Sequence, residues 1–143
     1  MKGLAPFQLL FPEIAKEEIR TATVMQGDSR LPADEYGFLE LYCVDPECDC
    51  RRVLINVMAR SSGEHVATLS HSYKAPHPDD DMEQTFLDPF NKQSARSEGL
   101  LGLFKEMLLD LGYHKRLERH YLMVKAAIAD PSVHPVTLCP LPG

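Results

Sequence analysis

The middle of the chain contains a stretch of alternating apolar and polar residues, and this pattern restricts the possible folds more than any other. The stretch is Arg51–Arg60, and the apolar residues that share one face of an extended chain there are Val53, Ile55, Val57 and Ala59. The residues on the opposite face include Arg52, Asn56 and Arg60. A period of two is typical of a half-buried strand. The sequence therefore predicts a strand whose apolar face packs on a core.

Other segments with strand character lie on either side of this one. Tyr36–Cys43 precedes it, His65–Lys74 follows it, and Glu18–Met25 is rich in β-branched residues. The residues SSGE before the last of these segments have hairpin-turn chemistry, since Gly63 can adopt a positive φ. Short connections between successive strands favour antiparallel pairing. We expect an antiparallel meander of three or four strands within residues 18–74.

The second half of the chain has helical periodicity. Residues 75–93 combine prolines with acidic residues, which predicts a linker loop. After Ser94, a suitable N-cap, apolar residues recur at the i, i+3, i+4, i+7 spacing of a helix. These residues are Leu100, Leu103, Phe104, Met107, Leu108 and Leu111. Gly112 is expected to end this helix in the left-handed conformation.

A second helix is predicted from about Tyr113 to Ala129. Its apolar stripe consists of Leu117, Tyr121, Val124 and Ile128. Asp130 and Pro131 should stop this helix, because proline disfavours the helical conformation in the residue before it. The helical pair then occupies residues 94–130, and residues 131–143 form a tail.

Strands followed by helices indicate an α+β fold, here a single domain over residues 1–143. The length is sufficient for one core. Burial of the first helical stripe should stabilise the fold by about 1.5–3 kcal/mol per side chain, which exceeds the contribution of a cap. We expect a three- or four-stranded antiparallel sheet with a metal-binding hairpin end, covered on one face by the two C-terminal helices.

Three of the four cysteines lie within eight residues, in the segment YCVDPECDCRRV. Cys43 ends one predicted strand, and Cys48 and Cys50 lie where the next one begins. Pro46 fixes φ in the turn between them, and the Asp45 side chain can bond the nearby backbone. Thiolates bind zinc in tetrahedral geometry, and a Cys-x4-Cys spacing suits such a site. The cluster therefore predicts a structural zinc site.

A closed zinc site requires a fourth ligand from elsewhere in the chain. Cys139, the remaining cysteine, is the favoured ligand and would tie the C-terminal tail to the sheet. His77 is the alternative. Pairing of the second and third hairpin strands would bring it, and less surely His71, toward Cys50.

Other interpretations of these residues remain open from the sequence. The thiols could be free, two of them could oxidise, or they could serve redox or catalytic chemistry. The acidic run His77–Asp81 could suggest a hydrolytic site, although a proline-flanked acidic run is more often a solvated loop. The sequence contains no G-x-S-x-G motif, glycine-rich phosphate loop or H-E-x-x-H motif.

The formal net charge of −6 argues against a nucleic-acid partner, because phosphate binding depends on basic side chains. A basic cluster in the second helix, with Tyr113, Arg116 and His120, could bind phosphate, but a solvated helix face is the commoner explanation. No apolar run reaches the roughly 20 residues that span a bilayer, and the N-terminus lacks a convincing signal peptide. We expect a cytoplasmic protein without membrane contact, where clustered cysteines are more often metal ligands than disulfides.

These observations favour a binding or scaffolding module over an enzyme. In this interpretation the metal stiffens a hairpin that presents charged residues to a protein partner, namely Asp45, Glu47, Asp49, Arg51 and Arg52. The first alternative is a metal-dependent enzyme with an open three-thiolate site and His77 or Asp79 nearby. The second is a homo-oligomer, in which surplus apolar surface packs on a second copy.

Overall fold

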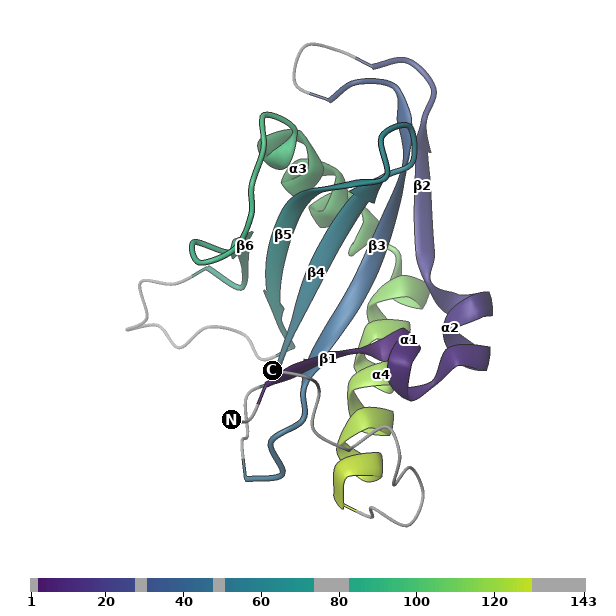
Figure 1. Cartoon of the computed structure of the whole chain (residues 1–143), viewed down its shortest axis with the longest axis vertical. Coiled ribbons are helices and arrows are strands. Elements are labelled where there is room, and N and C mark those ends of the chain that lie inside the picture. The colour runs from purple at the N-terminus through teal and green to yellow at the C-terminus, as the bar shows by residue number, and fades with distance from the viewer. Residues whose placement is uncertain (1–2, 28–30, 48–50, 74–82, 130–143) are drawn as a thin grey trace.

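The computed structural model describes residues 3–27, 31–47, 51–73 and 83–129, and this part of the chain has an α+β architecture (Figure 1). It contains an antiparallel sheet of six strands and four helices. The elements in chain order are β1 (Leu4–Pro6), α1 (Phe7–Leu10), α2 (Pro12–Glu18), β2 (Arg20–Val24), β3 (Asp34–Cys43), β4 (Arg52–Ala59), β5 (Glu64–Ser72), β6 (Thr85–Leu87), α3 (Ser97–Met107) and α4 (Leu111–Ala129). The predicted fold class is confirmed.

The sheet is a meander in which each long strand pairs with its neighbour along the chain. β3 pairs with β4, β4 with β5 and β5 with β6, all antiparallel. β1 and β2 both pair with β3 along its other edge, β1 with residues 41–43 and β2 with residues 34–38. The two short helices α1 and α2 therefore interrupt a single edge of the sheet (Figure 1).

The predicted number of three or four strands was wrong. β1 and β6 contain three residues each, which is too few for an alternating pattern to stand out in the sequence. β6 lies inside residues 75–93, where the prolines and acidic residues predicted only a linker loop. The short helices α1 and α2 were also missed, although Pro12 occupies the first position of α2, where proline is favoured.

The alternation in Arg51–Arg60 has the predicted consequence. The inward side chains of β4 are fully buried, and they are Val53, Ile55, Val57 and Ala59. The SSGE turn connects β4 to β5, and Gly63 within it has a φ of 67°, which other residues rarely adopt. Both the strand and the hairpin turn are confirmed.

The two C-terminal helices are confirmed as well. The buried residues of α3 include Leu100, Phe104 and Met107, three members of the first predicted stripe. The second stripe is buried throughout α4, at Leu117, Tyr121, Val124 and Ile128. All of these side chains except that of Ile128 form one core with the inward face of the sheet.

The predicted boundary between the two helices was wrong. α3 already ends at Met107, and Gly112 lies in the first turn of α4. The side chain of Asp110 accepts a hydrogen bond from the backbone N–H of Gly112 at 2.9 Å, so it satisfies a donor that the start of the helix leaves unpaired. Leu111, assigned to the first stripe, is 69% exposed as a result of this early start.

The helices lie on one side of the sheet only. In Figure 1, α3 and α4 lie behind β3, β4 and β5, and the opposite side of the sheet faces the viewer. α1 packs on the helix side too, since Phe7 contacts Tyr42 and stacks on His120 in α4. None of the helices that the structure describes has the length and apolar character needed to cross a bilayer.

Candidate functional site

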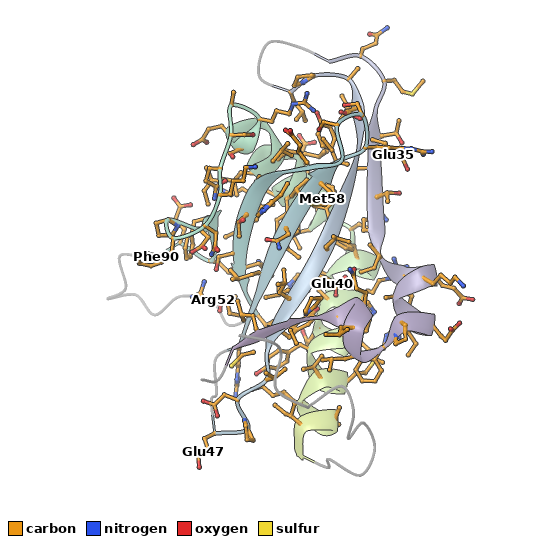
Figure 2. All side chains as sticks on the ribbon, in the orientation of Figure 1. Glu35, Glu40, Glu47, Arg52, Met58 and Phe90 are labelled. Carbon is orange, nitrogen blue, oxygen red and sulfur yellow. The ribbon has the colours of Figure 1, made fainter. Side chains whose placement is uncertain are left out.

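The side of the sheet away from the helices carries apolar residues, and we call it the open face. Its apolar side chains are Leu39, Leu41, Leu54, Met58 and Phe86, and each is half-buried. Strand pairing places them together, because Leu41 lies opposite Leu54 and Ser70 lies opposite both Leu54 and Phe86. Figure 2 shows Met58 and Arg52 on this side of the sheet.

The open face has free space above Gly37 of β3, whereas Thr68 and Ser70 of β5 are buried on it, and the Thr68 hydroxyl donates to the backbone carbonyl of Lys92 at 3.3 Å. Gly37 pairs with Met58 on this face, and no atom lies within 4 Å of the position that a Cβ would take there. Leu39 and Leu41 follow on the same strand. β3 thus has large apolar residues on both faces, whereas a strand with one solvated face usually alternates with polar residues.

A pocket of about 320 Å³ lies at one end of the open face. Its apolar walls are Leu4, Leu54, Phe86, Pro89 and Phe90. Phe90 is 91% exposed at the rim of this pocket (Figure 2). The Arg52 guanidinium lies over the Phe86 ring at 5.2 Å and donates a hydrogen bond to the Ser70 hydroxyl at 2.8 Å.

The charges on the open face lie at its two ends. Arg52 lies at the end where β4 begins. Glu35 lies at the other end, where it forms an ion pair with Arg60 at 2.5 Å. The residues between these ends that pair across the sheet are apolar or uncharged, for example Leu39 opposite Asn56 and Asn56 opposite Thr68.

The predicted zinc site falls mostly outside the described residues. Cys48, Cys50, Cys139 and the alternative ligand His77 belong to the ranges 48–50, 74–82 and 130–143. Cys43 ends β3 on the open face, half-buried, opposite Leu4. Within the described ranges, no group of three or more histidine, cysteine or acidic residues could hold a metal ion. The zinc site stays a prediction.

Two expectations about the hairpin end can be compared with the structure. The Asp45 side chain accepts a hydrogen bond from the backbone N–H of Glu47 at 2.9 Å, as predicted for this turn. His71, the less favoured alternative ligand, pairs with Val53 and therefore points to the helix side of the sheet. Cys43 points to the open face, so His71 and Cys43 do not face one another across the sheet.

A groove separates the hairpin end from α4. It has a volume of about 550 Å³, and Glu47 and Arg51 line it together with Tyr73, Tyr121 and Lys125. Two of the charged residues predicted to meet a partner thus lie here, whereas Arg52 lies on the open face and Asp49 lies outside the described residues. The predicted presenting surface is therefore divided between two places.

A buried polar network joins α4 to the sheet and to α2. His120 Nδ1 donates to Glu40 Oε1 at 2.6 Å, and His120 Nε2 lies 2.7 Å from Glu18 Oε1. The Tyr42 hydroxyl donates to the same Glu40 oxygen at 2.6 Å. The side chains of Glu40 and His120 are fully buried. Both ring nitrogens of His120 therefore lie within hydrogen-bond distance of a carboxyl oxygen.

The network shifts the ionisation of its outer members. The hydrogen bond from His120 lowers the pKa of Glu18, with partial burial opposing it and the Arg119 guanidinium, 2.7 Å away, assisting. Burial raises the pKa of Tyr42 well above its usual value. A histidine between two carboxyl groups, as His120 is between Glu40 and Glu18, has the composition of a proton relay. The side chains of His120 and Glu40 have no exposed surface, whereas the Glu18 side chain is 26% exposed.

The residues predicted to form a basic face on the second helix do not lie together on its exposed side. Tyr113 and His120 are buried on the core side of α4. The Arg116 guanidinium donates to the backbone carbonyl of Glu18 at 3.2 Å. These residues attach α4 to α2, so they do not form a phosphate-binding face.

A second buried histidine lies on the helix side of β5. His71 Nδ1 lies 2.8 Å from the Thr85 hydroxyl of β6, and its ring meets the His114 ring edge to face, with centroids 5.7 Å apart. Its Nε2 has no hydrogen-bond partner among the described residues. Burial, assisted by the nearby charges of His114 and Arg52, lowers the pKa of His71 to about 4.

Comparison with protein-family models, curated proteins and solved structures finds no significant match to this chain. The functional argument therefore rests on the chain's own geometry.

The sequence interpretation missed both the open face and the buried network, although signals for both were present. The inward positions of β3 read Tyr36, Phe38, Glu40 and Tyr42, and an acid in a buried register requires a buried partner. The outward positions Leu39 and Leu41 are apolar as well, which indicates a second covered face.

Proposed function

We propose that this chain is a binding module that docks a protein surface on the open face of its sheet. The observation that supports this proposal is the row of half-buried apolar side chains on the side of the sheet away from the helices, namely Leu39, Leu41, Leu54, Met58 and Phe86. A contiguous exposed apolar surface usually marks an interaction site. Full burial of such side chains stabilises a complex by up to about 1.5–3 kcal/mol each.

The proposal favours binding over catalysis because of where the titratable groups lie. Glu40 and His120 are titratable side chains in direct contact, and both are fully buried in the core. The pocket on the open face is lined mainly by apolar side chains, with Arg52, Ser70 and Asp88 as its polar members. Asp88 itself accepts a hydrogen bond from Asn91. Such a lining suits the recognition of an apolar surface.

A hydrophobic dye tests the proposal on dilute protein. We expect 1-anilinonaphthalene-8-sulfonate to bind the native chain with increased, blue-shifted fluorescence. Leu54→Lys should weaken this binding about tenfold, which corresponds to about 1.4 kcal/mol of lost apolar contact. Fluorescence titration measures the affinity, and circular dichroism confirms that the variant is folded.

The matched control is Leu109→Lys, which changes an 81% exposed leucine away from the open face. This variant should bind the dye as the wild type does. Equal dye binding by folded Leu54→Lys and wild type, or no binding by the wild type, would contradict the proposed docking face.

We propose, as a second function of the same chain, a structural zinc held by Cys43, Cys48, Cys50 and Cys139, with His77 as the alternative fourth ligand. Two observations support it: the position of Cys43 at the end of β3, and the Asp45 turn directly after it. Thiolate sites of this kind are closed and stabilise local structure. The proposal includes the reducing, cytoplasmic location in which free thiols persist.

Elemental analysis tests the zinc proposal. Protein purified under reductant and without chelator should contain one zinc ion per chain, and Cys43→Ser should lose it. Cys139→Ser should lose zinc whereas His77→Ala retains it. The opposite result would assign the fourth ligand to His77, and retention in both variants would indicate an open coordination position and favour a catalytic metal. Wild-type protein without any transition metal would refute the site.

A further inference from the structure

We infer that residues 131–143 of this chain bind in the groove between α4 and the hairpin end. This inference concerns a different surface from the open face, and it requires no metal. The aromatic lining of the groove, its balanced charges, its position at the end of α4 and the composition of residues 131–143 support it.

The groove has aromatic and apolar walls. The rings of Tyr73 and Tyr121 both line it, with their centroids 5.1 Å apart. The Tyr73 hydroxyl donates a hydrogen bond to the backbone carbonyl of Leu117 at 3.1 Å, which fixes this ring against α4. Leu122 of α4 also lines the groove and is 58% exposed. Aromatic-lined grooves of this kind bind proline-rich segments in an extended conformation.

The charged residues of the groove balance one another. The acids Glu47 and Glu118 line it together with the bases Arg51 and Lys125. The groove therefore has no formal net charge that would favour a strongly acidic or a strongly basic segment. An uncharged segment suits this lining.

Residues 131–143 have the matching composition. They include four prolines and no lysine, arginine, aspartate or glutamate, and their large aliphatic side chains are Val133, Val136, Leu138 and Leu141. Solvated segments are usually low in hydrophobicity and rich in charge, so burial of these side chains should be favourable. Proline also restricts its own φ and holds the preceding residue in an extended conformation, which lowers the entropy lost on binding.

The groove lies where residues 131–143 can reach it directly. Ala129 is the last residue of α4 and lines the groove, so the segment starts at its edge. From Glu118 to Ala129 the groove follows about 16 Å of α4, at about 1.5 Å per residue. An extended proline-rich segment advances about 3.1 Å per residue, so about six residues return along that length. Residues 131–136 are therefore enough to fill the groove.

Amide hydrogen exchange on the full chain tests the inference. The amides of Val133, Val136 and Leu138 should exchange about tenfold more slowly than in an unstructured chain. Leu122→Lys should remove this protection, because it places a charge in the apolar wall of the groove, and circular dichroism confirms that the variant is folded. Leu109→Lys is the matched control: it changes an 81% exposed leucine outside the groove, and it should keep the wild-type protection.

Two further measurements separate this occupant from the alternatives. Cys139→Ser should keep the protection at Val133 and Val136, because the groove rather than a metal holds them. The protection should be equal at about 1 and about 100 μM protein, since a segment joined to its own groove has an effective concentration in the millimolar range.

Unprotected amides in the wild type, or unchanged protection in folded Leu122→Lys, would refute the groove as the binding site. Loss of protection in Cys139→Ser would show that a metal holds the segment, and protection that appears only at high concentration would assign the groove to a second copy. Either result would overturn the inference, whereas elemental analysis decides the zinc proposal separately.

Discussion

Replacing Glu40 with alanine should lower the free energy of unfolding by about 2–4 kcal/mol, because a buried polar group that loses its hydrogen-bond partner costs about 1–3 kcal/mol and the hydrogen bond from Tyr42 is lost as well. Glu40 Oε1 accepts hydrogen bonds from both His120 Nδ1 and the Tyr42 hydroxyl, each at 2.6 Å. Without this carboxylate, His120 Nδ1 loses its partner, and the Tyr42 hydroxyl keeps only its longer hydrogen bond to the Leu117 carbonyl, at 3.3 Å. The His120 ring would also lose the contact that holds α4 against β3. Denaturation with urea measures the loss.

Glu35→Ala is the matched control, since Glu35 lies on the same strand but on the opposite face. Its ion pair with Arg60 is at the surface, where the arginine side chain is 77% exposed. Surface ion pairs contribute about 0–1 kcal/mol, so this variant should lose at most that amount. Similar losses for Glu40→Ala and Glu35→Ala would show that the buried network does not stabilise the fold.

The long elements of this fold could be predicted because each one repeats its own signal several times. Val53 to Ala59 alternate over four inward positions, and Leu117 to Ile128 follow one helical stripe over four positions. The three-residue strands β1 and β6 offer no repeat, and each forms only because a longer strand provides the pairing edge. The sequence predicts the start of α4 at about Tyr113, because Gly112 is a typical residue for the end of the preceding helix. In the structure α4 already starts at Leu111, and Asp110 caps it.

The buried network shows why a candidate site is harder to predict than a strand. Glu40 could be recognised as a buried acid from the residues around it in β3. Its partner could not, because His120 is 80 residues away and reaches Glu40 only after α4 docks on the sheet. Glu18, the third member, arrives from the opposite side of the ring through α2, a helix that the sequence did not predict.

The open face was missed for a different reason. Period-two patterning separates the two faces of a strand, but it indicates burial only for the face that is regularly apolar. β4 places Arg52 and Asn56 among its outward residues, a pattern that predicts a solvated outward face. The neighbouring β3 adds Leu39 and Leu41 to that same face, and only the register of the two strands shows that these leucines lie beside Leu54 and Met58.

Lowering the pH from about 6.5 to about 4 should reduce the free energy of unfolding through His71. Burial holds the pKa of this histidine at about 4 in the folded chain, whereas a histidine in an unfolded chain has a pKa of about 6.5. Between these values the unfolded chain binds a proton that the folded chain excludes. Protonation therefore favours unfolding as the pH falls, and above about pH 6.5 the effect vanishes. With about 1.4 kcal/mol per pKa unit, the full loss is about 3 kcal/mol.

His71→Gln should flatten the pH dependence of stability between about pH 6.5 and pH 4.5, measured as urea unfolding at several pH values. His65→Gln, which changes a half-buried histidine of the same strand, should keep the wild-type slope. The carboxyl groups whose pKa is lowered affect the free energy of unfolding only at lower pH. The Ser61 hydroxyl lowers the pKa of Asp34 to about 2, and His120 lowers that of Glu18, so the stability they provide is lost only below about pH 4.5. A slope that persists unchanged in His71→Gln would assign the acid sensitivity to other groups.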